Sequence, residues 1–160
     1  SPPRKAKESV SKEKLGGIVM DDTEAKLTGF DAHGSTASPF VGEGYAHDGN
    51  ADKGKQQAVF AVKLPRSGAY EVRFAYTALG NRATNVPVTV KFGGGEKKIS
   101  IDERKKAPID GFLISLGTFN FDAAEAVVEV SNEGTDGHVI IDAVQWLPVD
   151  MVLPPDVLTK

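Results

Sequence analysis

The sequence of 160 residues contains no cysteine, so neither a disulfide framework nor a thiolate zinc site can form. It also lacks any apolar run that approaches the roughly 18 residues needed for a transmembrane helix, and no signal peptide is recognisable. The first residue is serine rather than methionine. We therefore interpret the sequence as a module of a longer protein, and we expect no membrane partner.

Basic residues are fewer than acidic ones, and they are unevenly placed. The net charge is −3, but residues 1–15 hold five basic and two acidic side chains, a net +3, which leaves −6 for the remainder. An acidic folded part argues against nucleic acid as a partner. Residues 1–16 lack periodicity and are expected to be a flexible basic linker from an upstream domain. Residues 17–148 then form one domain, and residues 149–160 a C-terminal tail.

No stretch has the apolar period of a long helix; short apolar stretches alternate instead with Gly, Pro, Asn and Asp. In "GAYEVRFAYT" (68–77), every second side chain is apolar from Tyr70 to Tyr76, which predicts a half-buried strand. Further strands are expected at 17–22, 57–64, 86–92, 97–102, 113–121, 126–130 and 138–147. These strands predict an all-β fold, an antiparallel β-sandwich of the jelly-roll type with no helix longer than about two turns.

Aromatic residues make up only 8% of the chain, and most of them follow the period of the strands. We expect six in the core: Tyr70, Phe74, Tyr76, Phe92, Phe119 and Trp146. The glycine-rich stretch 93–98 joins two alternating segments and predicts a hairpin turn rather than a phosphate-binding loop. Pro87 is expected at the start of its strand or on a sheet edge.

Signatures of catalysis are absent. There is no G-x-S-x-G motif, and none of the histidines has the spacing of a zinc site; they are His33, His47 and His138. Asp21 and Asp22 are adjacent, so on a strand they would face opposite sides and could not act as a pair. Asp142 lies in the most apolar strand and is expected to be a buried, hydrogen-bonded anchor for a loop. We therefore expect neither an active site nor a cofactor.

The stretch "EGYAHDGNADKG" (43–54) resembles the opening of a calcium loop, with Asp48, Asn50 and Asp52 at alternate positions. An EF-hand loop that begins at Asp48 requires glycine at its sixth position and a bidentate acid at its twelfth, where this chain has Lys53 and Val59. The pattern excludes an EF-hand, and we expect no metal ligand here. A structural calcium site built partly from backbone carbonyls stays open as an alternative.

The order of several motifs resembles the carbohydrate-binding-like domain of golvesin and of the C-terminal end of xanthan lyase. The motifs are "DDT" (21–23), "VGEGYAHD" (41–48), "KLPRSGAYEVRFAY" (63–76), "NRATNVPVTV" (81–90), "IDGFLISLGTF" (109–119), "SNEGTDG" (131–137) and "GHVIIDAVQWLP" (137–148). The resemblance implies a galactose-binding-like jelly roll from about residue 18 to residue 148. It also implies a non-catalytic, sugar-associated module of the kind appended to polysaccharide lyases and to flavin-dependent oxidoreductase-like proteins. Related sequences often carry tryptophan at or near Phe30, where an exposed ring would stack on sugar, and glutamine at Glu103.

Sugar sites combine an aromatic face with amide, acid and guanidinium groups that bind hydroxyls. Such groups concentrate in the three polar loops 41–54, 78–86 and 131–137, which we expect at one rim of the sandwich. The candidate ligand-binding residues are Tyr45, His47, Asp48, Asn50, Asn81, Arg82, Asn85, Asn132 and Asp136. Asn and Asp also make turns by bonding their own backbone, and Arg82 would also fit an ion pair with Asp48, so a structural role stays open beside the binding role.

These features together predict a non-catalytic accessory module of a larger bacterial protein, secreted or periplasmic, that binds an acidic or complex polysaccharide. The alternative is a purely structural sandwich that packs against its own upstream catalytic domain without binding sugar. In isolation the domain is expected to be a monomer.

Overall fold

The computed structural model describes residues 9–122 and 125–149, and this part of the chain is all-β. Its helices are two 3-10 turns of three residues, η1 (Lys12–Lys14) and η2 (Asp22–Glu24). No helix within the described ranges is long and apolar enough to cross a membrane. The predicted fold class is thereby confirmed. Residues 1–8 of the expected linker and 150–160 of the expected tail lie outside the described residues.

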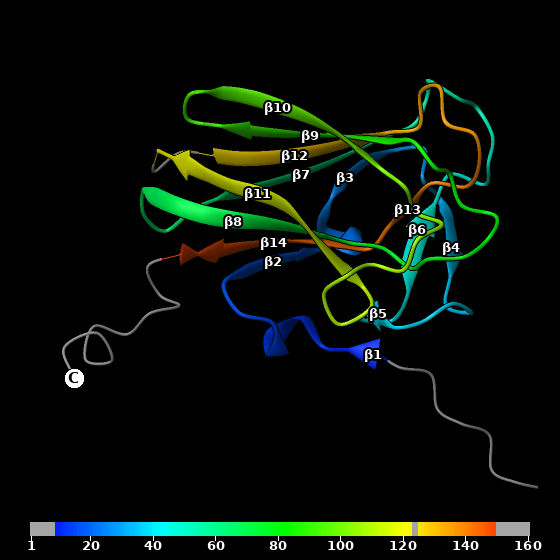
Figure 1. Cartoon of the computed structure of the whole chain (residues 1–160), viewed down its shortest axis with the longest axis horizontal. Helices are drawn as coiled ribbons and strands as arrows, with labels where there is room; N and C mark the ends of the chain where they lie inside the picture. Colours follow the sequence, from blue (N-terminus) through cyan, green and yellow to red (C-terminus); the bar gives the residue numbers. More distant parts are fainter. Residues whose placement is uncertain (1–8, 123–124, 150–160) are drawn as a thin grey trace, which may run out of the picture.

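Two larger sheets face each other (Figure 1). The first has the order β10 (Gly95–Ile101), β9 (Val86–Phe92), β12 (Glu125–Ser131), β7 (Gln57–Lys63) and β3 (Lys26–Thr28). The second has the order β11 (Leu113–Phe121), β8 (Gly68–Ala75), β14 (Ala143–Pro148) and β2 (Ile18–Asp21). All neighbours in both sheets are antiparallel. The arrangement is the predicted antiparallel sandwich.

Two small sheets complete the fold. One joins β13 (Ile140–Ile141), β6 (Tyr45–His47) and β4 (Ala32–Gly34), at the right-hand end of the view in Figure 1. The other pairs β1 (Ser9–Val10) with β5 (Phe40–Val41) in parallel. These strands have two or three residues each, which is too short for a period of two to show in the sequence. They bring the segment 32–47 to one end of the sandwich.

The segment 138–147, predicted as one strand, is two strands that belong to different sheets. Ile140 and Ile141 pair with β6, whereas β14 pairs with both β8 and β2. The chain changes sheet at Asp142. The sequence gives no sign of this because the residues on both sides of Asp142 are apolar, so both sheets accept them equally well.

Residues 9–16, assigned to the flexible linker by their composition, are folded against the domain. β1 pairs with β5, and Val10 and Leu15 pack against a small cluster that includes Val41 and Phe112. Two apolar side chains in a basic segment are a weak sequence signal. Burying them nevertheless contributes free energy that a composition count does not register.

The main core lies between the two large sheets and follows the predicted alternation. In β8, Tyr70, Val72 and Phe74 are buried, and the residues between them are half-exposed. Tyr76 and Trp146 are buried as expected. Phe92 and Phe119 differ: they are only half-buried and stack on each other with ring centroids 4.9 Å apart.

Two local predictions, the glycine-rich hairpin turn and the position of Pro87, are confirmed. Phe92 pairs with Gly95 across Gly93 and Gly94, so the glycine-rich stretch is a hairpin turn. Pro87 lies at the start of β9, before the segment that pairs with β12, so its missing N–H costs no hydrogen bond in that ladder.

Candidate functional site

The three polar loops converge at one end of the sandwich, beside β4, β6 and β13 (Figure 1). Arg82 forms an isolated bridge with His138, and the His138 N–H donates to the Asn81 carbonyl at 2.9 Å. The Asn85 amide donates to the Gly134 carbonyl at 2.9 Å. The Asp48 N–H donates to the Val139 carbonyl at 3.2 Å. Loops that are distant in sequence therefore share one hydrogen-bonded frame.

Asp48 is the centre of this frame and is 4% exposed. Its carboxylate accepts hydrogen bonds from Lys53 Nζ at 2.8 Å, Asn132 Nδ2 at 3.0 Å, Val139 N at 3.0 Å and Asn50 N at 2.9 Å. Burial works to raise the pKa of Asp48, but these hydrogen bonds, led by the one from Lys53, hold it below the usual value. Asp48 therefore joins the loops as a buried carboxylate whose partners are protein groups.

The loop 43–54 is consequently a turn held by a lysine. The ammonium of Lys53, which occupies the position where an EF-hand needs glycine, bonds Asp48 Oδ2 and the Gly137 carbonyl at 2.7 Å. Asn50 and Asp52 adopt positive φ angles, as turn residues of this type can. The positive charge that balances Asp48 is thus supplied by the chain itself.

Arg82 lies beneath the surface, which differs from the expectation that it offers its guanidinium to a ligand. It is 4% exposed and donates to the Thr77 carbonyl at 3.0 Å, Thr77 Oγ1 at 3.1 Å and Asn81 Oδ1 at 2.8 Å. Its guanidinium lies 5.5 Å from the centre of the Tyr45 ring. The predicted alternative, an ion pair between Arg82 and Asp48, is not formed either: the ion-pair partner of Asp48 is Lys53. Arg82 anchors the loop 78–86.

Tyr45 and Asn132 are also buried, at 4% and 0% exposure. The Asn132 Oδ1 accepts from the N–H groups of Gly54 and Gln56 at 3.0 and 3.2 Å, and its amide nitrogen donates to Asp48. The Tyr45 hydroxyl accepts from the Ala37 N–H at 3.3 Å. These two residues and Arg82 support the loops from below, so the structure assigns them the structural role that the sequence left open.

The other predicted site residues reach the surface. Asn50, Asn81, Asn85 and Asp136 are exposed, and His47 is half-exposed. Asp136 is held by Thr84, whose N–H and hydroxyl donate at 2.7 and 2.6 Å and lower the pKa of the Asp136 carboxyl.

Two surface residues at this end were not predicted as site residues. His138 lies edge-on to His47 with ring centroids 5.7 Å apart, and Leu79 is 47% exposed. The sequence gives no sign of a partner for His138, because only the folded chain brings it to His47. Burial, followed by the charges of His138 and Arg82, lowers the pKa of His47. We call the set His47, Asn50, Leu79, Asn81 and His138 the three-loop face.

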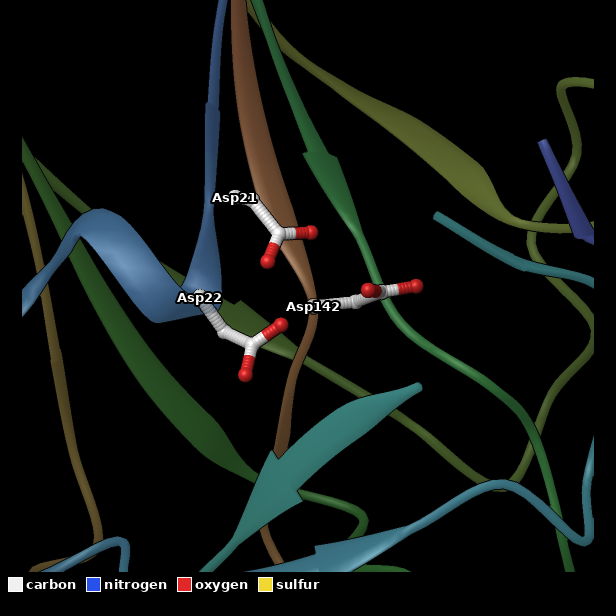
Figure 2. A group of neighbouring side chains, drawn as sticks. All are labelled: Asp21, Asp22 and Asp142. Atoms are coloured by element: carbon white, nitrogen blue, oxygen red, sulfur yellow. The ribbon is translucent and has the colours of Figure 1, made fainter. Parts of the chain in front are cut away.

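A second polar site, which the sequence analysis does not predict, lies where β2 ends. Asp21 ends β2 and Asp22 begins η2, so the two side chains do not take opposite sides of a strand, as the sequence predicted. Together with Asp142, each offers a carboxylate oxygen within 4.8 Å of the others (Figure 2). The Asp22 N–H donates to the Asp142 carbonyl at 2.8 Å. The sequence does not predict this cluster because the expected strand 17–22 includes Asp22, whereas the observed strand ends at Asp21.

The predicted anchoring role of Asp142 is confirmed. Its side chain is 0% exposed, and Oδ2 accepts from the Val41 N–H at 2.9 Å, which ties β5 to the point where the chain changes sheet. Burial raises the pKa of Asp142 well above its usual value. Burial, and then the charge of Asp21, raises the pKa of Asp22 to about 8.

Residues 18–147 match the family model of the golvesin C-terminal domain. The chain belongs to that family. It is 32% identical over 142 residues to a xanthan lyase of Bacillus sp. (strain GL1), a match that covers 84% of this chain and 15% of the relative. The solved Paenibacillus xanthan lyase matches 82% of this chain and 13% of its own length at 31% identity, with a TM-score of 0.76. The chain therefore spans about one seventh of these relatives, which are much larger carbohydrate-active enzymes.

More distant structures share the fold of this golvesin C-terminal domain. A Podospora anserina GH26-CBM35 β-(1,4)-mannanase matches 83% of this chain and 28% of its own, at 18% identity and a TM-score of 0.60. A cycloalternan-forming enzyme of Listeria monocytogenes matches 82% of this chain and 12% of its own, at 19% identity and a TM-score of 0.59. At these identities the likeness establishes the sandwich fold alone.

The two family positions noted in the sequence, Phe30 and Glu103, are both fully buried in this golvesin C-terminal domain. Phe30 belongs to the main core, so an aromatic ring here is no exposed stacking platform, contrary to expectation. Glu103 Oε1 accepts from the Ile140 N–H at 2.7 Å, while Oε2 has no hydrogen-bond partner within the described structure. Burial raises the pKa of Glu103 well above its usual value.

Proposed function

We propose that this golvesin C-terminal domain is a non-catalytic accessory module of a larger bacterial protein and that it binds polysaccharide through the three-loop face. The observation that carries the proposal is that some loop residues are buried and fix the loops, whereas others are exposed at the surface. Asp48, Arg82 and Asn132 are buried and hydrogen-bonded, and they fix the loops from which exposed amides and imidazoles project. A rigid support with polar groups at its surface is the arrangement that a binding site requires.

The chemistry of the three-loop face suits sugar hydroxyls. The Asn50 amide carries both donors and acceptors, the Asn81 amide nitrogen adds donors beside the Oδ1 that accepts from Arg82, and a neutral imidazole carries one donor and one acceptor. The His47 Nδ1 accepts from the Gly49 N–H at 3.0 Å, so in the neutral ring the proton is on Nε2, which remains available as a donor. The exposed side chain of Leu79 supplies apolar surface for the C–H side of a sugar ring. Arg82 is buried and offers no guanidinium to a uronic acid, whereas the exposed Arg104, whose Nε donates to the Arg82 carbonyl at 2.6 Å, lies next to this face.

The similarity to xanthan lyases adds support, because a polysaccharide lyase gains from a module that keeps it on its polymer. The partners in this proposal are therefore a polysaccharide and, within the parent protein, a catalytic domain. We also propose that the parent is a secreted or periplasmic bacterial protein, since that is where polymeric sugar is encountered.

Affinity electrophoresis of the isolated domain in gels that contain single polysaccharides, xanthan among them, tests the proposal. Retention by at least one polymer is expected. The variant Asn81→Ala should weaken retention about tenfold, which corresponds to the loss of one or two hydrogen bonds. Asn120→Ala is the matched control: Asn120 is exposed on β11, outside the three-loop face, and its removal should leave retention unchanged.

A folded domain that is retained by no polymer in a broad panel would contradict the proposal and favour the purely structural module that packs against its own catalytic domain. Turnover of any polymer by the isolated domain would contradict its non-catalytic part.

A further inference from the structure

Arg104 holds a guanidinium in a defined orientation beside the three-loop face. The residue is exposed, yet its Nε donates to the Arg82 carbonyl at 2.6 Å. This hydrogen bond leaves the two terminal nitrogens, which have no hydrogen-bond or ion-pair partner within the described part of the chain. A guanidinium that is fixed at one edge and open at the other can bind a carboxylate through two parallel hydrogen bonds.

The turn that carries Arg104 is fixed on both sides of this residue. Before it, the Glu103 N–H donates to the Ala83 carbonyl at 2.9 Å. After it, the Lys105 carbonyl accepts from the Tyr76 hydroxyl at 2.6 Å. A side chain on a fixed backbone loses less conformational freedom when it binds a ligand, so this turn is preorganised.

Arg104 is anchored where two of the three polar loops meet. The Arg82 carbonyl oxygen, which accepts from Arg104, lies against Gly137: a Cβ at Gly137 would be only 2.6 Å from this oxygen. Only glycine therefore permits the approach of the loop 131–137 to the loop 78–86. His138 follows Gly137, forms the isolated bridge with Arg82 and belongs to the three-loop face. Arg104 thus lies at the border of that face.

The acidic groups near Arg104 are occupied by other partners. Both oxygens of Asp136 accept hydrogen bonds from Thr84, at 2.7 and 2.6 Å. These bonds are the main cause of the lowered pKa of Asp136, to which the charge of Arg104 adds least. Asp102 Oδ1 accepts from the backbone N–H of Arg104 at 3.0 Å rather than from its guanidinium. The charge of Arg104 is therefore available to an anion from outside the described structure.

We propose that Arg104 makes this domain selective for anionic polysaccharides, by binding the carboxylate of a sugar unit while the three-loop face binds hydroxyls. This inference rests on the proposed function, because it names the class of polymer that the same face binds. The groups divide by chemistry. The planar guanidinium matches a carboxylate, whereas the Asn81 amide and the His47 imidazole match hydroxyls.

The charge of the whole chain sharpens the inference. The net charge is −3, and the part of the chain after residue 15 carries −6. Such a protein repels a polyanion at long range, so binding requires a cation at the contact itself. The segment 1–15, at +3, is the other positive region, and an experiment has to separate it from Arg104.

Affinity electrophoresis of the whole chain in xanthan, alginate and polygalacturonate tests the inference. Each polymer is compared with its carboxyl-reduced form, in which –CH₂OH replaces the carboxylate. We expect at least one native polymer to retain the wild type, and its reduced form to bind about 10- to 100-fold more weakly, as the loss of a charge-assisted contact predicts.

Arg104→Gln is the decisive variant, because it removes the guanidinium and keeps a polar side chain. It should weaken retention by the native polymer about 10- to 100-fold and leave the weak retention by the reduced form unchanged. Asn81→Ala, in contrast, should weaken retention by both forms. Arg104→Lys keeps the charge but not the planar fork, so it should recover only part of the loss.

Arg66→Gln is the matched control, because it changes the net charge by the same amount. Arg66 is exposed in the turn between β7 and β8, at the left in Figure 1 and away from the three polar loops. This variant should be retained as strongly as the wild type. Far-UV circular dichroism checks the fold of each variant, and Arg104→Lys takes the place of Arg104→Gln if the latter does not fold.

Equal retention by a native polymer and its reduced form would overturn the selectivity and leave the proposed function intact. Unchanged retention in Arg104→Gln, or equal losses in Arg104→Gln and Arg66→Gln, would also overturn it, since polyanion binding would then come from residues 1–15 or from overall charge. Retention by no polymer in either form would overturn the proposed function, and this selectivity with it.

Discussion

The Lys53 ammonium lies 2.8 Å from Oδ2 of Asp48, whose side chain is fully buried, whereas the Lys53 side chain is 28% exposed. The lysine thus reaches inward from the surface and neutralises a carboxylate that also holds Asn132 and the Val139 N–H. The ion pair lies within the loop 43–54, and its two members hold the loop 131–137 through hydrogen bonds from Asn132 to Asp48 and from Lys53 to the Gly137 carbonyl. We therefore expect this contact to stabilise the candidate binding end.

Replacing Lys53 with methionine should lower the free energy of unfolding by about 1–3 kcal/mol, because Asp48 would keep its burial but lose its charge partner. Urea denaturation followed by circular dichroism measures the change. Lys55→Met is the control: Lys55 is exposed in the same turn and should change stability by no more than about 0.5 kcal/mol. Equal effects of the two variants would show that the ion pair is not important for stability.

Arg82→Ala should also destabilise the domain by about 1–3 kcal/mol, since it leaves the Thr77 carbonyl without its donor and removes the group that packs on Tyr45. Lys105→Ala is the control for loss of a cationic side chain, because Lys105 is exposed. A melting curve for Arg82→Ala that overlays the wild type, together with lost polysaccharide retention, would instead make Arg82 a ligand contact.

Glu103→Gln should stabilise the domain at neutral and alkaline pH. The folded-state pKa of Glu103 is raised by burial above the ordinary 4.5, so the folded state retains a proton that the unfolded state releases. The contribution of Glu103 to the free energy of unfolding of the wild type is therefore fully present below about pH 4.5. It is lost as the pH rises through the folded-state pKa. Glutamine mimics the protonated form, so the advantage of the variant should grow with pH. Unfolding free energies of both proteins at several pH values check this, and a difference that does not vary with pH would contradict it.

The histidine pair predicts a second pH dependence, with the opposite sign. The pKa of His47 is lowered from 6.5 in the folded state, mainly by burial, so the unfolded state binds a proton more readily. Stability should fall as pH drops below about 6.5. His47→Gln cannot gain this charge and should lose less stability than the wild type between pH 7.5 and pH 5. Parallel slopes for the two proteins would exclude a contribution from His47.

The sequence by itself determined the fold class and most long strands. Period-two alternation indicates which side chains face a core, and in β8, β9 and β12 this alternation extends over most of the seven or eight residues of each strand. The hairpin at Gly93 and Gly94 was equally predictable, because glycine permits the turn that joins the strands. The convergence of the three polar loops followed from the sandwich, in which loops gather at the ends of the sheets.

Which loop residues are buried was decided only by the tertiary structure. Asp48, Arg82 and Asn132 are residues of the types that form ligand sites, yet each finds its partners within the chain. Some of these partners lie in another loop: Asp48 bonds to Asn132, 84 residues away. The aspartate cluster joins Asp22 to Asp142, and it forms because one strand stops at Asp21 while another changes sheet at Asp142. Local sequence sets the period of a strand, but where a strand ends is set by the sheet with which it pairs. Strand pairing and burial depend on contacts between residues distant in sequence, which no local pattern contains.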